Sequence, residues 1–246
     1  EGRRLQAEMD EAAKIQAKLL PECPPEIPGY EAAGLSIPRG GVGGDYFDYI
    51  PESEGAWGFA IADVSGKGMQ AALLMATLRA GLRSEVSRRR DLADIATALN
   101  SFLYESSTKD SYATLFYAQL QPETGVLTSI NAGHNYPLVV RHDGCLERLE
   151  KGGLVLGMYP DDMLKQIWEY EQDTTQLCCG DVVLFYTDGV TETLNVDNEV
   201  YGEARLEENA KRFRHATAAE ICTALYTSVT DFQREAQQFD DLTLMV

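Results

Sequence analysis

The order of the expected elements predicts an α+β fold. Runs of residues with strand character come in groups, and two pairs of amphipathic helices separate these groups. Turn signals at residues 122–125 and at Asp143-Gly144, a strong hairpin signal, join neighbouring strands of one group directly. A sheet built from alternating βαβ units would instead place a helix between each two strands. Long antiparallel runs with grouped helices therefore favour α+β.

The first stretch, residues 3–20, is expected to form a helix. Its apolar residues are spaced 4-3-4-3, a coiled-coil-like seam with one polar position, made of Leu5, Met9, Ala12, Gln16 and Leu19. Prolines then end the helix and form a rigid joint, at Pro21, Pro24, Pro25 and Pro28. We therefore expect a linker helix with a proline-rich joint over residues 1–28, followed by one domain over residues 29–246.

The first half of this domain is expected to contain a group of strands and then a helix pair. The strands cover residues 30–37, 46–50 and 57–62. A helix from residue 68 to about residue 90 follows, with the apolar stripe Ala71, Leu74, Leu78 and Leu82 on one face. Asp91 can cap a second helix that extends to about residue 106.

The second half repeats this order. Its strands cover residues 113–121, 126–131, 137–141, 146–149, 167–171 and 182–186. A helix over residues 203–215 comes next, and Thr217-Ala-Ala-Glu220 is a capping box that opens another helix to about residue 237. Residues 242–246 close the chain as a strand.

Composition restricts the function classes. The net charge is −18, and this acidity disfavours binding to a nucleic-acid backbone, which depends on clustered Lys and Arg. No apolar run approaches the roughly 18–20 residues of a membrane helix, so we expect no membrane contact from this segment. Five cysteines without a C-x-x-C pair and three dispersed histidines make structural zinc improbable and indicate reduced thiols in a cytoplasm. Because residue 1 is Glu, we expect a longer protein with an upstream sensor or receiver domain.

Four aspartate-bearing segments lie at the ends of expected strands. They are Gly43-Gly44-Asp45-Tyr46-Phe47-Asp48, Asp63-Val64-Ser65-Gly66-Lys67-Gly68, Tyr186-Thr187-Asp188-Gly189 and Phe239-Asp240-Asp241-Leu242-Thr243. Taken singly, each could be ordinary turn chemistry. Taken together, four clustered carboxylates suit hard divalent cations, and without metal they would repel one another and take up protons. Gly44 and Gly66 allow close backbone approach, so we regard them as candidate substrate-binding positions.

These segments, in this order and spacing, resemble the type 2C (metal-dependent) serine/threonine phosphatases, and most closely their bacterial SpoIIE/RsbU-like branch. Residues 42–48, 63–68 and 185–189, Asn-Ala-Gly-His-Asn at 131–135 and Asp-Asp-Leu-Thr at 240–243 all resemble that branch's motifs, as does the entry Ile15-Gln16 … Leu19-Leu20-Pro21. The resemblance spans residue 12 to the end. It implies a two-sheet antiparallel β-sandwich flanked by helix pairs, with a metal site at one edge.

The resemblance also implies a catalytic centre. Asp45 and Asp63 would hold two Mn²⁺ or Mg²⁺ ions and, through them, an activated water that attacks phosphorus, so that no side-chain nucleophile is needed. The further ligands would be the Val64 main-chain carbonyl, Asp188 and Asp240, and which of Asp240 and Asp241 binds stays open. Lys67 stands where many relatives have His, and it either contacts phosphate or is solvated. Arg39 is near the position of a phosphate-binding arginine but out of register. His134 is interpreted as a loop residue with satisfied hydrogen bonds rather than a ligand.

The expected function is therefore hydrolysis of phosphoserine or phosphothreonine on a partner protein, an anti-sigma-factor antagonist in this branch. The alternative is a catalytically silent module of the same fold that binds such a partner as a switch. A Ca²⁺-stabilised structural domain is disfavoured because no D-x-D-x-D spacing occurs. Residues 3–20 would pair with a copy of themselves in a homodimer or cover one edge of the sandwich, because a lone helix of this length is marginal in water.

Overall fold

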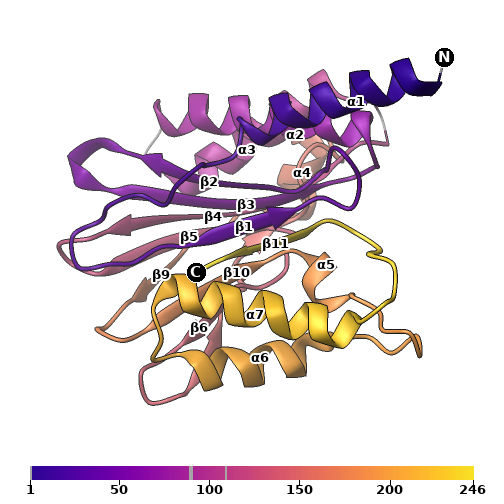
Figure 1. Ribbon diagram of the computed structural model, residues 1–246. Coiled ribbons are helices and arrows are strands. Elements are labelled where there is room, and N and C mark those ends of the chain that lie inside the picture. Colours follow the sequence, from indigo (N-terminus) through magenta and orange to yellow (C-terminus); the bar gives the residue numbers. More distant parts are fainter. Residues whose placement is uncertain (1, 89–90, 109) are drawn as a thin grey trace.

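Two β-sheets pack face to face between two layers of helices (Figure 1). The computed structural model describes residues 2–88, 91–108 and 110–246. This four-layer arrangement confirms the α+β class and the β-sandwich that the motifs implied. Almost every strand pair is antiparallel, and the exception is the short parallel pair β5–β8.

The first sheet has the strand order β2-β3-β4-β5-β8, with β9 pairing along β5. Its strands are β2 (Tyr46–Pro51), β3 (Trp57–Val64), β4 (Ala113–Gln121), β5 (Val126–Ala132), β8 (Gly152–Gly153) and β9 (Asp173–Gln176). The register of β3 on β4 places Asp63 opposite Thr114. Asp63 therefore lies one residue before the end of its strand, as the sequence predicts for a site at a sheet edge.

The second sheet has the strand order β1-β11-β10-β6-β7. Its strands are β1 (Gly34–Ile37), β11 (Leu242–Met245), β10 (Val182–Tyr186), β6 (Leu138–Val140) and β7 (Leu146–Arg148). The last strand of the chain, β11, lies inside the sheet between β1 and β10. Because β10 and β11 are antiparallel, the residues that follow β10 lie beside those that precede β11.

The helix pairs cover the outer faces of the two sheets. Helices α2 (Met69–Val86) and α3 (Leu92–Ser106) lie on the first sheet, and α6 (Gly202–Phe213) and α7 (Ala218–Gln233) lie on the second (Figure 1). Three apolar clusters result, one under each helix pair and one between the sheets. Both cap predictions are confirmed: Asp94 donates its backbone N–H to the Asp91 carboxylate at 3.1 Å, and the Thr217–Glu220 capping box is complete.

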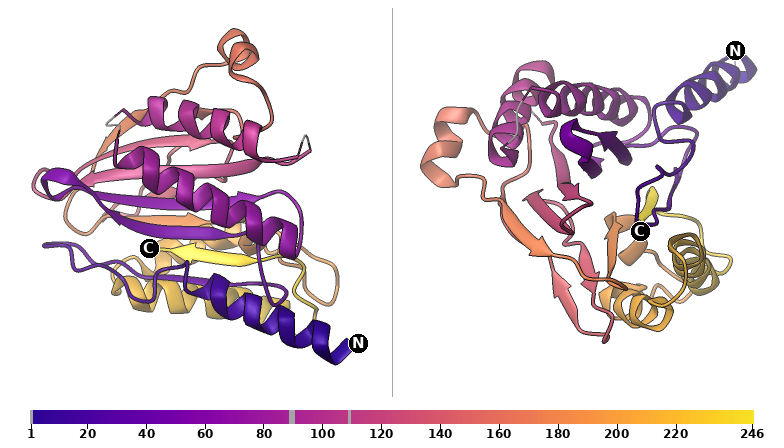
Figure 2. Two further views of the ribbon diagram at one scale, coloured as in Figure 1. Left: turned by 90° about the horizontal axis from the view of Figure 1, so that it is seen from above. Right: turned by 90° about the vertical axis from the view of Figure 1, so that its left-hand side faces the viewer.

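Two short helices were not expected, and α1 lies outside the layers. The short helices are α4 (Asp161–Ile167) and α5 (Asp188–Thr191), and a single 3₁₀ turn covers Ser53–Gly55. Helix α1 (Gly2–Ala17) extends away from the body toward the N-terminus (Figure 2). Among the described residues, no helix is both long enough and apolar enough to span a bilayer.

The predicted strand at residues 167–171 is wrong. Ile167 is the last residue of α4, which begins after Pro160 with two aspartates in its first turn, a start signal that the alternating apolar residues obscured. The buried Tyr170 and the indole of Trp168 instead donate side-chain hydrogen bonds to the Leu154 and Gly152 carbonyls, at 3.0 Å each. The actual strand, β9, starts at Asp173.

Smaller differences concern the ends of elements. The expected strand at 30–37 is regular only from Gly34, since Tyr30 forms an isolated bridge with Ile27. The helix expected over residues 3–20 ends at Ala17, and α2 ends at Val86. Residues 89–90 of that predicted helix lie outside the described residues.

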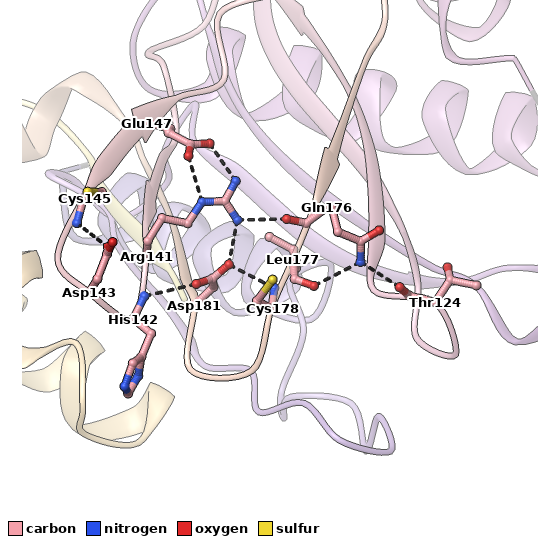
Figure 3. A network of polar contacts seen from close by, with 10 residues as sticks. All are labelled: Thr124, Arg141, His142, Asp143, Cys145, Glu147, Gln176, Leu177, Cys178 and Asp181. Carbon is pink, nitrogen blue, oxygen red and sulfur yellow. Dashed lines mark hydrogen bonds and ion pairs between the residues drawn. The ribbon is translucent and has the colours of Figure 1, made fainter.

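A polar network lies at the N-terminal end of β10, whereas Asp188 follows the C-terminal end of that strand (Figure 3). The Arg141 guanidinium donates to the Glu147 carboxylate at 2.7 and 2.9 Å, to Asp181 at 2.6 Å and to the Gln176 carbonyl at 2.8 Å. Arg141 follows β6, Glu147 lies in β7, Asp181 precedes β10 and Gln176 is the last residue of β9. The network therefore connects four strands. The candidate site lies at the other, C-terminal, end of β10.

Candidate metal centre

The fold brings the four aspartate segments to one edge of the sandwich. Asp45 precedes β2, Asp63 lies at the end of β3, Asp188 follows β10, and Asp240 and Asp241 precede β11. Hydrogen bonds to two of these aspartates join the sheets at this edge. The Thr187 hydroxyl donates to the Asp45 carboxylate at 2.7 Å, and the Gly44 N–H donates to the Asp241 carboxylate at 2.7 Å.

Asp45 is the most deeply buried of these carboxylates, with 5% of its surface exposed. Burial raises its pKa well above the usual value, and the nearby Asp63 raises it further, whereas hydroxyl groups of Thr243 and Thr187 oppose the shift. Thr187 is itself held by β11, because it exchanges hydrogen bonds with the Thr243 backbone at 3.1 Å. The orientation of Asp45 is therefore set by residues of the opposite sheet.

Asp63 and Asp188 repel each other across the edge. Burial raises the pKa of Asp63 to about 7, with further contributions from the charges of Asp188 and Asp240. Burial also raises the pKa of Asp188, and Glu192 and Asp240 add to the effect. In the described part of the chain, no ion pair with Lys, Arg or His involves Asp45, Asp63, Asp188 or Asp240. The cluster thus has the unbalanced negative charge that the sequence predicts.

Asp240 and Asp241 differ in what they contact. Both carboxylate oxygens of Asp241 accept backbone N–H groups, from Arg39 and from Gly44, at 2.7 Å each. Asp241 thereby ties the loop before β2 to the start of β11. One oxygen of Asp240 accepts the Asp241 N–H at 2.9 Å, and its other oxygen accepts no hydrogen bond among the described residues. This difference favours Asp240 as the ligand.

Glycine is favoured at Gly44 and at Gly66, the two positions singled out from the sequence, for different structural reasons. A Cβ on Gly44 would lie 3.0 Å from the Val64 carbonyl oxygen, so a side chain there would crowd the candidate main-chain ligand. Gly66 has φ +106°, a conformation that favours glycine, and a Cβ there would meet only the Gln70 side chain, at 4.0 Å.

Asp48, the second aspartate of its motif, lies away from the centre. It is buried under α2, where Arg83 donates two hydrogen bonds to its carboxylate at 2.7 Å each and the Tyr46 hydroxyl donates a third at 2.7 Å. Its charge is balanced, so it has the role of a structural ion pair.

Lys67 and Arg39 meet at the rim of the cluster. The Lys67 ammonium lies 4.9 Å from the centroid of the Phe239 ring, and the Arg39 guanidinium carbon lies 5.6 Å from it. Both are cation–π contacts. The ring directly precedes Asp240 and Asp241, so these two cations lie beside the acidic cluster. Within the described part of the chain, neither of them forms an ion pair with it.

The donor set fits hard divalent cations in its chemistry. All of the clustered side chains offer carboxylate oxygen, which Mg²⁺ and Mn²⁺ prefer, and their repulsion would be relieved by positive charge. Among the residues that the structure describes, no three acidic, imidazole or thiol side chains are arranged to hold an ion as they stand.

Several residues of the site were not assigned from the sequence. Thr187 and Thr243 lie inside the recognised motifs, directly before Asp188 and two residues after Asp241. Their hydroxyls act on Asp45, which is distant in sequence, so only the strand order could reveal the contact. Thr114 had no motif to mark it at all.

Comparison with known proteins gives a family match. Residues 53–246 match the model of the family described as Stage II sporulation protein E (SpoIIE). Phosphoserine phosphatase RsbU of Bacillus subtilis (strain 168) is 28% identical over 243 residues, which cover 98% of this chain and 70% of RsbU.

Solved structures share the fold. The SiaA-PP2C domain of Pseudomonas aeruginosa superposes with a TM-score of 0.85 at 18% identity, covering 99% of this chain and 96% of that domain. RsbX, described as a complex with magnesium, superposes with a TM-score of 0.61 at 18% identity, covering 87% of this chain and 92% of RsbX. The PP2C-like fold of this chain is thereby established.

Proposed function

Because this chain belongs to the SpoIIE family and is a protein serine/threonine phosphatase of the type 2C (PP2C) class, we propose that it hydrolyses phosphoserine or phosphothreonine on a partner protein by means of two divalent cations. The observation that carries this proposal is the uncompensated carboxylate cluster. At the edge where the two sheets meet, burial raises the pKa of Asp63 and of Asp188, and the charge of Asp240 adds to both shifts. Divalent cations would relieve that repulsion.

In this proposal, Asp45, Asp63, Asp188, Asp240 and the Val64 carbonyl hold Mn²⁺ or Mg²⁺. When bound, the cations supply an activated water and neutralise charge on the phosphoryl oxygens. Thr187 orients Asp45 by its hydrogen bond to the carboxylate. Asp241 keeps the loop that carries Gly44 next to the site and is assigned no metal.

The substrate we propose is a small phosphorylated antagonist of an anti-sigma factor, presented to the edge that carries the cluster. RsbU, whose name describes it as a phosphoserine phosphatase, supports a phosphoprotein substrate. We further propose that the chain works in the cytoplasm as the output domain of a longer signalling protein; its five free cysteines support this compartment. Residues 3–20 would then link it to an upstream sensor or receiver domain.

The second candidate is a catalytically silent module that binds such a partner as a switch. The Arg39–Lys67–Phe239 contact at the rim supplies a surface on which a partner could dock. The unpaired carboxylates argue against this candidate, because a silent module gains nothing from buried repulsion.

The test is phosphate release from a phosphorylated antagonist protein, with Mn²⁺ and after EDTA treatment. We expect turnover only with metal, and no loss after iodoacetamide because no cysteine is among the proposed site residues. Inactivation by iodoacetamide but not by EDTA would exclude the proposed reaction.

The matched variants are Asp63→Asn and Asp188→Asn. Each should lower turnover at least about 100-fold, because replacing a ligand should cost no less than the largest effect seen for residues that only support a metal ligand. Unfolding should stay cooperative. The isosteric change removes one negative charge from a repelling cluster, so the metal-free variants should be at least as stable as the parent protein. Near-normal turnover of both at saturating Mn²⁺ would contradict the site assignment.

A further inference from the structure

His134 occupies a turn between the two sheets. It lies in the connection from β5 to β6 and is buried, with 4% of its surface exposed. The Asn131 side chain fixes this turn, since its amide donates to the His134 carbonyl at 3.0 Å and its oxygen accepts the His134 N–H at 2.7 Å. The backbone of His134 is therefore held in place by a residue of β5.

The two ring nitrogens contact different sheets. Nδ1 lies 2.8 Å from the Thr114 hydroxyl oxygen on β4, and Nε2 lies 3.1 Å from the Tyr186 carbonyl oxygen on β10. A carbonyl oxygen can only accept, so Nε2 must donate. In a neutral ring Nδ1 then accepts the Thr114 hydroxyl proton, at a shorter distance than the 3.2 Å that separates the Thr114 hydroxyl oxygen from its other acceptor, the Asp63 carbonyl oxygen. Burial lowers the pKa of His134 to about 4, which agrees with a neutral ring.

Both partners of the ring are next to candidate metal ligands. Thr114 pairs with Asp63 in the β3–β4 register, and its hydroxyl oxygen accepts the Asp63 N–H at 3.3 Å. Tyr186 is the last residue of β10, two positions before Asp188. The hydrogen bonds thus run in one direction, from the Asp63 amide through Thr114 and His134 to the Tyr186 carbonyl.

We infer that His134 is a positioning residue that fixes the spacing of Asp63 and Asp188, and with it the affinity of the site for divalent cations. The inference rests on the proposed function. Asp63 and Asp188 belong to different sheets and repel each other, so without a link the edge would tend to open. The series of hydrogen bonds through Thr114 and His134 crosses between the sheets at this edge and opposes that opening. His134 contacts neither carboxylate and is given no role in the reaction itself.

The experiment measures Mn²⁺ binding by isothermal titration calorimetry, with Mn²⁺ as the only ligand, for His134→Ala, His134→Gln and Thr114→Val. We expect His134→Ala and Thr114→Val to bind Mn²⁺ about 10- to 100-fold more weakly, the range for residues that support a ligand. His134→Gln should recover most of the affinity, because an amide can donate to Tyr186 and accept from Thr114. Thr114→Val keeps the side-chain shape and tests the link if His134→Ala fails to fold.

Thr128→Val on β5 is the control, since this half-buried threonine makes no side-chain hydrogen bond within the described residues. It should bind Mn²⁺ as the parent protein does. Unfolding of each metal-free variant separates positioning from general stability. Unchanged Mn²⁺ affinity in Thr114→Val and His134→Ala, with or without lost stability, would overturn the inference. If the parent protein binds Mn²⁺ and Asp63→Asn does not, the proposed metal centre stands regardless of that result; failure of the parent protein to bind would overturn both.

Discussion

Asp45 and Asp48 lie three residues apart in one motif and have opposite electrostatic environments. Asp48 faces α2 and is neutralised by Arg83, with Arg79 at 3.9 Å. Asp45 faces the other sheet, accepts a hydrogen bond from the Thr187 hydroxyl and forms no ion pair with a cation among the described residues. The difference follows from which side of the strand each residue faces, and the carboxylate type alone gives no sign of it. Only an unbalanced carboxylate is expected to gain from a metal ion.

This contrast predicts different effects of one chemical change. Asp48→Asn should lower the free energy of unfolding by about 1–3 kcal/mol, because it weakens hydrogen bonds to a charged partner that is itself partly exposed. It should leave Mn²⁺ affinity unchanged. Denaturant unfolding and calorimetry on Asp48→Asn and Asp63→Asn test the contrast. Similar profiles for the two variants would contradict the assignment of separate roles.

The carboxylate cluster also predicts how the stability of the metal-free protein depends on pH. The pKa of Asp63 is about 7 in the folded chain and near 3.8 in an unfolded one, so the folded state holds more protons between these values. Its contribution to stability is complete below about pH 4 and is lost as the pH rises through about 7. His134 acts in the opposite sense, because its folded pKa of about 4 lies below the unfolded value.

Comparison with a variant separates these two contributions. Asp63→Asn keeps His134 but lacks the titrating group, so its free energy of unfolding, relative to that of the parent protein, should rise between pH 5 and pH 7.5 in EDTA. Urea unfolding at the two pH values measures the difference. A constant difference would show that Asp63 ionises with an ordinary pKa in the metal-free fold. Excess Mn²⁺ should remove the effect in the parent protein.

At the scale of elements, the sequence predicted the strands and helices that have one dominant local signal. Asp91 and the Thr217–Glu220 box marked two helix starts, and the Asp143-Gly144 turn marked a hairpin. The wrong strand at residues 167–171 lacked such a signal, and its alternating apolar residues pack by side-chain contacts to the β8 segment. The pairing of β11 between β1 and β10 depends on contacts between distant residues, and no local pattern contains it.

The C-terminal half of α1 contacts the site through the Gln16 side chain. The Gln16 amide donates to the Gly43 carbonyl at 2.7 Å, and its oxygen accepts the Gly43 N–H at 2.9 Å. Gly43 precedes Gly44, whose N–H binds Asp241. A polar residue that interrupts the apolar seam thus fastens the helix to the loop before Asp45.

Gln16→Ala should therefore weaken Mn²⁺ binding as well as stability. Loss of two hydrogen bonds is expected to lower the free energy of unfolding by about 1–2 kcal/mol and to free the loop that carries Gly43 and Gly44. Lys14→Ala, on an exposed part of the same helix, is the control and should change neither quantity. Unchanged Mn²⁺ affinity in Gln16→Ala would show that this contact serves attachment of the helix only.

At the scale of the whole molecule, α1 has two possible binding partners, a second copy of itself and the domain that follows it. Met9, Ala12 and Leu19 of the seam are half-buried in the single chain, Ile15 is 60% exposed, and the start of the helix extends away from the body (Figure 2). The side chain of Leu5 lies outside the described ones. A second copy of this helix could cover the extended part, whereas Gln16 is already engaged by the catalytic domain.

We therefore predict a homodimer through residues 3–20 whose formation competes with the Gln16–Gly43 contact. Gln16→Leu should strengthen the dimer, because it makes the seam wholly apolar, and should at the same time release the loop beside Asp45. Light scattering on the whole chain, on Gln16→Leu and on a chain that starts at Pro21 measures the association. A dimer that is lost when residues 1–20 are removed supports the prediction. Monomers in all three cases would contradict the prediction and leave α1 as a helix that covers one edge of the sandwich.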